Sequence, residues 1–113
     1  MIILLEINYE YIKGVLFVRV NGKLTKNNSY KLRNYLPNVI MKYGIKYMVY
    51  NFYNLEDIDE TGVNTLLCGI KAIEDNKGNV YMCEVPKKLE NKLNKININN
   101  SLNELSVVEL FNI

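Results

Sequence analysis

Histidine is absent from this chain of 113 residues, which removes the commonest general base and the commonest zinc ligand. A Ser-His-Asp or Cys-His catalytic site therefore cannot form within the chain. Cysteine is scarce: Cys68 and Cys83 lie among apolar residues without a CxxC spacing, and we expect two buried thiols in a reducing cytoplasm. A glycine-rich phosphate loop is also missing, because Gly62 and Gly69 are too isolated to form one.

Long apolar runs are lacking as well. The longest, MIILL and TLLC, are far too short to span a bilayer, and no basic segment precedes a long apolar stretch. We therefore expect neither a membrane segment nor a secretory signal. The 14 basic and 12 acidic residues nearly balance, which does not favour nucleic acid as a partner. The length predicts a single domain, residues 1–113.

The first part of the chain predicts a β-hairpin followed by a helix. Residues 2–8 and 15–22 are rich in strand-forming side chains, with a turn pivoting at Gly14 between them. Apolar residues then recur at helical spacing up to Tyr43, with Ser29 or Thr25 as a cap and Gly44 as a stop. Pro37 predicts that this helix is kinked or split. On the second strand, one face carries Val15, Phe17 and Arg19, and the other carries Leu16, Val18 and Val20.

Strands and helices alternate in the rest of the chain. We expect strands at 45–52 and 80–85, a loop at 53–60, helices at 61–76, 86–95 and 102–111, and a short edge strand at 96–98. Ser101 and Glu104 fit a capping box for the last helix. Its predicted apolar face consists of Leu102, Leu105, Val108 and either Leu110 or Phe111. The order predicts an α/β fold, a mixed sheet flanked by about four helices.

Four carboxylates gather within five residues, at Glu56, Asp57, Asp59 and Glu60. Oxygen ligands could hold a hard cation, and two carboxylates could form an acid–base pair. The EF-hand pattern is absent, however, and acids are enriched at helix N-termini because they complement the unsatisfied N–H groups there. We therefore favour a helix start at IDETG, residues 58–62, and predict no metal and no cofactor. The lysines at 87, 88, 92 and 95 do not share one helix face and predict a solvated surface.

The run from residue 45 to residue 93 resembles the core of the STAS domains, and especially the bacterial anti-sigma factor antagonists. That family has a strand, a loop ending in Asp-Ser-Ser/Thr-Gly, an amphipathic helix, a glycine turn and a valine-rich strand that often ends in cysteine. Asp59, Thr61 and Gly62 fit the first motif, and Gly78, Val80 and Cys83 fit the later elements. The resemblance implies a STAS-type sheet flanked by helices, with the motif at a helix N-terminus.

The resemblance also implies a function. Such antagonists bind an anti-sigma factor, usually a serine kinase, and are ejected when the kinase phosphorylates the first hydroxyl after the Asp. Here that position is Glu60, which has no hydroxyl, and Thr61 matches the second hydroxyl of the motif. Glu60 could imitate the phosphorylated, released state, or it could make the domain permanently active. We therefore expect a non-enzymatic binding module that phosphorylation does not switch.

The partner-binding and switch residues implied are Asp59, Glu60, Thr61 and Gly62, and the secondary partner surface is Asp57, Lys23, Thr25 and Asn64. Lys23 and Thr25 stand where the family often has acids, which indicates a different partner or charge balance. The alternatives are an accessory subunit of a transporter ATPase, a scaffold component of a signalling complex or, least favoured, an enzyme using the acidic loop. We expect a cytoplasmic monomer, with a dimer left open.

Overall fold

The computed structural model describes residues 4–101 and 103–113. It opens with the predicted antiparallel hairpin, formed by β1 (Leu5–Ile12) and β2 (Val15–Leu24). The hairpin prediction is confirmed, although positions 2 and 3 of the first predicted strand lie outside the described residues. The turn is tighter than expected because it consists of Lys13 and Gly14, both with positive φ, and only glycine adopts that conformation without steric cost.

The later strands run parallel to their neighbours and complete a mixed sheet. They are β3 (Tyr47–Asn51), β4 (Leu55–Ile58), β5 (Asn79–Cys83) and β6 (Asn99–Ser101). The strand order is β1-β2-β3-β5-β6, and β4 pairs with the end of β2. The prediction of a loop over 53–60 is therefore wrong in part, because its centre forms β4. The predicted edge strand at 96–98 is displaced to 99–101, where β6 pairs with β5.

Pro37 splits the first helical segment as the sequence predicts. The two pieces are α1 (Tyr30–Arg33) and α2 (Leu36–Tyr43), and Pro37 lies in the first turn of α2, where its missing N–H costs little. Gly44 ends α2 in the left-handed conformation, also as predicted. Neither predicted cap acts through its side chain on the helix start. The hydroxyl of Ser29 donates instead to the carbonyl oxygen of Thr25, at 2.6 Å.

The longest helix, α3 (Glu60–Asp75), follows β4, and α4 (Glu104–Phe111) closes the chain. The helix predicted over 86–95 is wrong: a 3-10 turn, Lys87–Leu89, is followed by further turns. Asparagines at 91 and 94 disfavour a regular helix, because their side chains compete for backbone hydrogen bonds. The predicted capping box is also replaced, since Asn103 caps α4 by accepting from the N–H of Ser106 at 2.9 Å.

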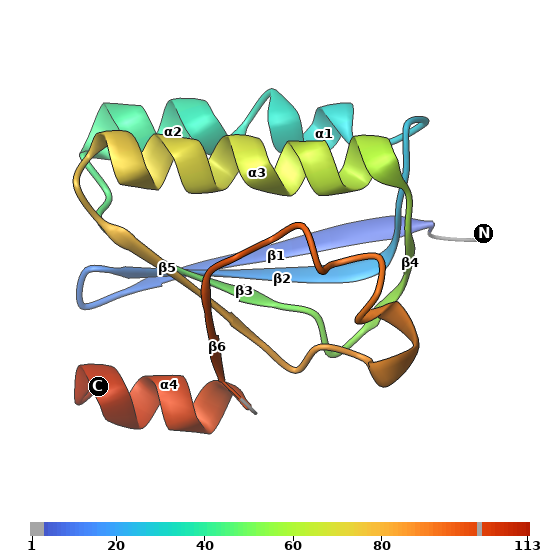
Figure 1. Cartoon of the computed structure of the whole chain (residues 1–113). Helices are drawn as coiled ribbons and strands as arrows, with labels where there is room; N and C mark the ends of the chain where they lie inside the picture. The colour runs from blue at the N-terminus through green and yellow to red at the C-terminus, as the bar shows by residue number, and fades with distance from the viewer. Residues whose placement is uncertain (1–3, 102) are drawn as a thin grey trace.

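The sheet separates two apolar clusters (Figure 1). α1, α2 and α3 lie on one face and share the larger cluster with Leu16, Val18 and Val20 of β2, while α4 covers the other face, over Val15 and Phe17. The alternation predicted for β2 is therefore confirmed. The face predicted for the last helix is wrong in part. Val107 is its buried residue, Val108 and Phe111 are half-buried, Leu105 and Leu110 are exposed, and Leu102 lies outside the described residues.

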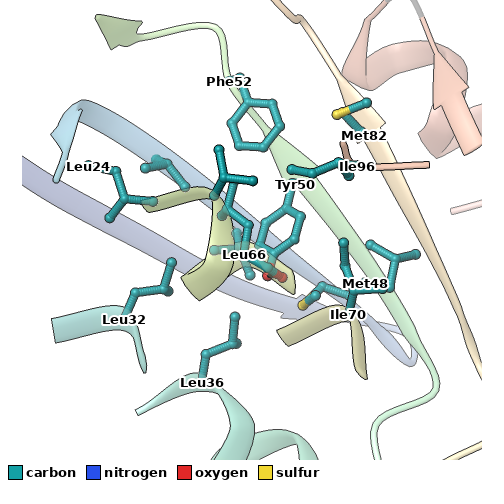
Figure 2. Close-up of a cluster of buried hydrophobic side chains, with 14 of the residues drawn as sticks. Leu24, Leu32, Leu36, Met48, Tyr50, Phe52, Leu66, Ile70, Met82 and Ile96 are labelled. Atoms are coloured by element: carbon teal, nitrogen blue, oxygen red, sulfur yellow. Dashed lines mark hydrogen bonds between the residues drawn. The ribbon is translucent and has the colours of Figure 1, made fainter. Parts of the chain in front are cut away.

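Tyr50 fixes α3 against the sheet in the larger cluster (Figure 2). Its buried hydroxyl donates to the carbonyl oxygen of Leu66 at 2.9 Å, and burial raises the pKa of Tyr50 well above its ordinary value. Gly69 faces the same hydroxyl, and a Cβ at that position would overlap it. Since α3 lies this close to β3, the direction of its N-terminus is set by core packing.

Arg19 attaches α4 to the opposite face of the sheet. Its guanidinium donates through Nε and Nη2 to the two carboxylate oxygens of Glu104, each at 2.9 Å, and through Nη1 to Glu10 and Asn8. The pKa of Arg19 is raised, chiefly by the hydrogen bond to Glu104. Cys83, at the end of β5, is buried as expected, whereas Cys68 is exposed on α3, so the prediction of two buried thiols is wrong for Cys68.

Candidate functional site

Asp59 caps α3, and its carboxylate also holds a second segment of the chain. One oxygen, Oδ1, accepts from the N–H of Gly62 at 2.8 Å, which is the capping bond that the sequence predicts. The other, Oδ2, accepts from the backbone N–H of Lys26 at 2.9 Å. The N–H of Asp59 in turn donates to the carbonyl oxygen of Leu24 at 3.2 Å. Asp59 therefore links the start of α3 to the loop that follows β2.

Gly62 permits the close approach between those two segments. It is buried in the first turn of α3, and a Cβ added there would overlap the carbonyl oxygen of Leu24 and the side chain of Ile58. Any larger residue would have to push the loop after β2 away from the helix. Gly62 therefore has a structural role at the helix start, and its predicted role in binding a partner stays a prediction.

Glu60 is exposed in the first turn of α3, and Thr61 beside it is half-buried. A carboxylate in this position is stabilised by the positive end of the helix dipole. The hydrogen bond found at Thr61 uses its backbone carbonyl, which accepts from the hydroxyl of Thr65 at 3.0 Å. Asn64, one turn further along, is also exposed. Glu60 and Asn64 therefore lie on the outer surface of the helix start.

Asp57, at the end of β4, is flanked by two lysines. Lys23 is its partner across the β2–β4 pairing, and the ammonium of Lys92 donates to Oδ1 of Asp57 at 2.6 Å. The hydrogen bond from Lys92, and then that from the N–H of Ile58, lowers the pKa of Asp57. Thr25 lies in the adjoining loop, where its carbonyl oxygen accepts a hydrogen bond from the backbone N–H of Ser29 at 2.8 Å. The structure thus gathers the predicted residues at one end of the molecule.

A hollow of about 350 Å³ lies between the start of α3 and the segment 91–95. Ile58 and Val63 contribute its apolar lining, and Glu60, Lys92 and Lys95 contribute charge. Lys92 and Lys95 are exposed, as predicted for a solvated surface, but they also border IDETG, which the sequence did not predict. No local pattern signals that contact, because Lys92 and Asp57 are 35 residues apart.

The carboxylates that suggested a cation or an acid–base pair are dispersed by the fold. Asp59 accepts two backbone N–H groups, and Asp57 pairs with Lys92. Within residues 4–101 and 103–113, no group of three or more acidic or cysteine side chains is arranged to hold a metal ion. In the same part of the chain, no helix is long and apolar enough to cross a bilayer. Asp59 therefore builds the helix start, and Asp57 fastens the segment that carries Lys92 beside it.

Comparison with known proteins agrees with this architecture. The model of the STAS domain family matches residues 6–111. The chain belongs to the STAS domain family. It is 30% identical over 81 residues to an anti-sigma F factor antagonist of Paenibacillus polymyxa, a match that covers 72% of this chain and 69% of the relative.

Solved structures share the STAS fold at low sequence identity. The anti-sigma factor antagonist SpoIIAA in its unphosphorylated form superimposes with a TM-score of 0.79 at 16% identity, covering 95% of this chain and 98% of that one. An anti-sigma factor antagonist from Mycobacterium paratuberculosis gives a TM-score of 0.75 at 11% identity, covering 96% and 95%. The predicted α/β class and STAS-type mixed sheet are therefore confirmed.

Proposed function

We propose that this STAS domain, residues 1–113, is a non-enzymatic regulatory module that binds an anti-sigma factor of the serine-kinase type and so controls sigma-factor-dependent transcription. The observation that carries the proposal is the helix start at Asp59, built as a rigid and exposed N-terminus of α3. The curated relative, an anti-sigma F factor antagonist, supports the class of partner. We propose a cytoplasmic location, because a partner that controls a sigma factor acts where transcription takes place.

The binding surface consists of the exposed part of the helix start and the segments fastened to it. Glu60, Thr61 and Asn64 supply the outer face of α3, and Lys23 and Asp57 supply the adjoining strand ends. Asp59, Gly62 and the loop at Thr25 hold these groups in place through backbone contacts. A surface fixed in this way binds without a large ordering cost, because its groups are already in place.

Glu60 makes this module insensitive to the phosphorylation that the resemblance implies for its relatives. A carboxylate cannot accept a phosphoryl group, and it supplies one permanent charge where phosphoserine would add about two. Its exposure leaves that charge available to a partner, and its place in the first turn stabilises the helix. Affinity for the partner therefore does not change with phosphorylation, and the fraction of partner that is bound depends on the abundance of the domain.

The experiment is capture of the partner from an extract of the native cell on immobilised domain, with identification by mass spectrometry. We expect an ATPase of the anti-sigma type among the proteins retained by the wild-type domain. Asn64→Arg, which places a long charged side chain on the outer face of α3, should abolish retention. Asn38→Arg makes the same change at an exposed position of α2 and should leave retention intact.

The identity of the retained protein separates this role from the alternatives. A transporter ATPase or a signalling scaffold retained in an Asn64-dependent manner would replace the anti-sigma partner with one of the other two assignments. Retention that is equal for Asn64→Arg and Asn38→Arg would show that the helix start is not the binding surface. In that case the proposal fails even if an anti-sigma factor is recovered.

A further inference from the structure

We infer that the surface around the helix start takes an acidic face of its protein partner, because three exposed lysines surround it while two of its four acids, Asp57 and Asp59, are engaged in contacts within the domain. This inference rests on the proposed function and specifies the chemistry of its partner. The three lysines are Lys23, Lys26 and Lys95, and we call them the lysine collar.

Contacts on the start of α3 bring the collar together from three separate segments. Lys23 is the strand partner of Asp57. Lys26 is held next to α3 by the bond between its N–H and Asp59, a bond that leaves its ammonium unused. Lys95 lines the hollow beside Glu60. Figure 1 shows the same convergence, since the loop after β2, the end of β4 and the segment after β5 lie at the end of the sheet where α3 begins.

Two of the four acids of this surface are engaged within the domain. Both oxygens of Asp59 accept backbone N–H groups, and Asp57 is paired with Lys92 at 2.6 Å. Glu56 lines the neighbouring hollow together with Lys88. Glu56 and Glu60 are exposed and take part in none of the four ion pairs found within residues 4–101 and 103–113, and Glu60 is the one in the first turn of α3.

The lysines, by contrast, keep their charge available. Within those same described residues, none of the four ion pairs involves Lys23, Lys26 or Lys95, and all three are exposed. Three ammonium groups outside those ion pairs, against the two carboxylates of Glu56 and Glu60, make the outer surface positive, although the sequence of the motif is acidic. Carboxylates on a partner would complement it, and such rim charges act mainly on the association rate and its dependence on salt.

Nucleic acid fits this surface less well than a protein does. Glu60 lies among the collar lysines and would repel a continuous phosphate backbone, and the residues that line the hollow include no aromatic side chain on which a base could stack. A folded partner can place its carboxylates opposite the lysines and leave Glu60 facing a neutral or basic group. The collar is thus suited to a discrete pattern of acids.

The test is to add charged probes to the isotopically labelled domain at low salt and to monitor binding through the NMR chemical shifts of its backbone amides. The probes are hexaglutamate, hexalysine and a short oligothymidylate. Hexaglutamate should shift the amides of residues 23–26, 60–64 and 91–95. Lys26→Glu combined with Lys95→Glu should weaken this binding by roughly fivefold or more. Lys42→Glu combined with Lys46→Glu reverses the charge of two exposed lysines at the other end of the molecule. This control variant should bind hexaglutamate nearly as well as wild type.

Several results would overturn the inference. They are an absence of shifts with hexaglutamate, shifts scattered over other lysines, equal weakening in the two double variants, or tighter binding of hexalysine or oligothymidylate to the same residues. These probes need no cellular partner. Failure to capture an anti-sigma factor would therefore remove the proposed function and leave the charge preference standing. A captured partner together with a negative titration would remove only the charge preference.

Discussion

The backbone N–H of Lys26 donates a hydrogen bond of 2.9 Å to Oδ2 of Asp59, 33 residues further along the chain. The same carboxylate caps α3 through its other oxygen, Oδ1. One side chain therefore fixes the direction of the helix start and the position of the loop after β2. Asp59 of the IDETG motif therefore supports the surface on which the proposed function depends, whereas Glu60 projects from it.

Asp59→Ala should destabilise the domain by about 1–2 kcal/mol, because it removes a helix cap and leaves the N–H of Lys26 without its acceptor. Urea unfolding monitored by circular dichroism measures the change. Asn64→Ala, on the exposed side of the same helix, should stay within about 0.5 kcal/mol of wild type. An equal effect of the two substitutions would show that the carboxylate does not join the two segments.

Gly62→Ala should cost about 1–3 kcal/mol, since the new Cβ overlaps the carbonyl oxygen of Leu24 and must displace the loop after β2. The displacement should also appear as amide shifts in residues 24–26. Cys68→Ala in the exposed part of α3 provides the control, with little change expected. A Gly62→Ala variant as stable as wild type, with an undisturbed loop, would rule out the close contact.

Glu104→Gln should loosen α4 from the sheet, because it weakens the paired hydrogen bonds from Arg19. The pair is partly exposed, so we expect a loss of roughly 1 kcal/mol. Hydrogen exchange of the α4 amides is the measurement that separates local undocking from global unfolding. Glu109→Gln, at an exposed position of α4, should leave exchange unchanged, and faster exchange in that variant as well would contradict the role of Arg19.

Stability should decline in alkaline solution. Burial raises the pKa of Cys83 to about 12, and burial together with Tyr35 raises the pKa of Tyr9 to about 12. Both groups are neutral in the folded state, so their contribution is complete below their unfolded pKa values, near 9 and 10, and is lost as the pH rises toward 12. Urea unfolding at a series of pH values from 8 upward should show this decline. Tyr9→Phe should reduce its slope, and an unchanged slope would refute the assignment to Tyr9.

The sequence predicts best where a residue's immediate neighbours decide its structure. The alternation of side chains along β2 determines which of them face each side of the sheet. Pro37 splits a helix because it lacks a backbone N–H donor, and Asp59 caps α3 through a bond within one turn. The wrong predictions concern elements whose structure depends on contacts between residues far apart in the sequence. β4 is only four residues long and forms because the end of β2 is available as a parallel partner. Its two apolar residues, Leu55 and Ile58, give too little periodicity to predict a strand.

The last helix and the candidate site illustrate the same limit. α4 turns Val107 inward because Arg19 holds Glu104 on the sheet, a contact across 85 residues that no local pattern contains. At the site, the acids of IDETG predict a helix start, and Asp59 caps α3 there. The pairing of Lys92 with Asp57, and hence the charge that the surface presents, depends on how the segment after β5 turns back.

The claim that Glu60 replaces a phosphorylation switch is tested most directly by incubating the domain with ATP and the anti-sigma kinase that it captures. Wild type, Thr61→Ala and Glu60→Ser are then compared by intact mass and by affinity for the kinase. We expect no phosphate on wild type or Thr61→Ala and an affinity that ATP does not change. In Glu60→Ser we expect one phosphate, with affinity becoming ATP-dependent. Phosphate on Thr61 of the wild-type domain would contradict the account.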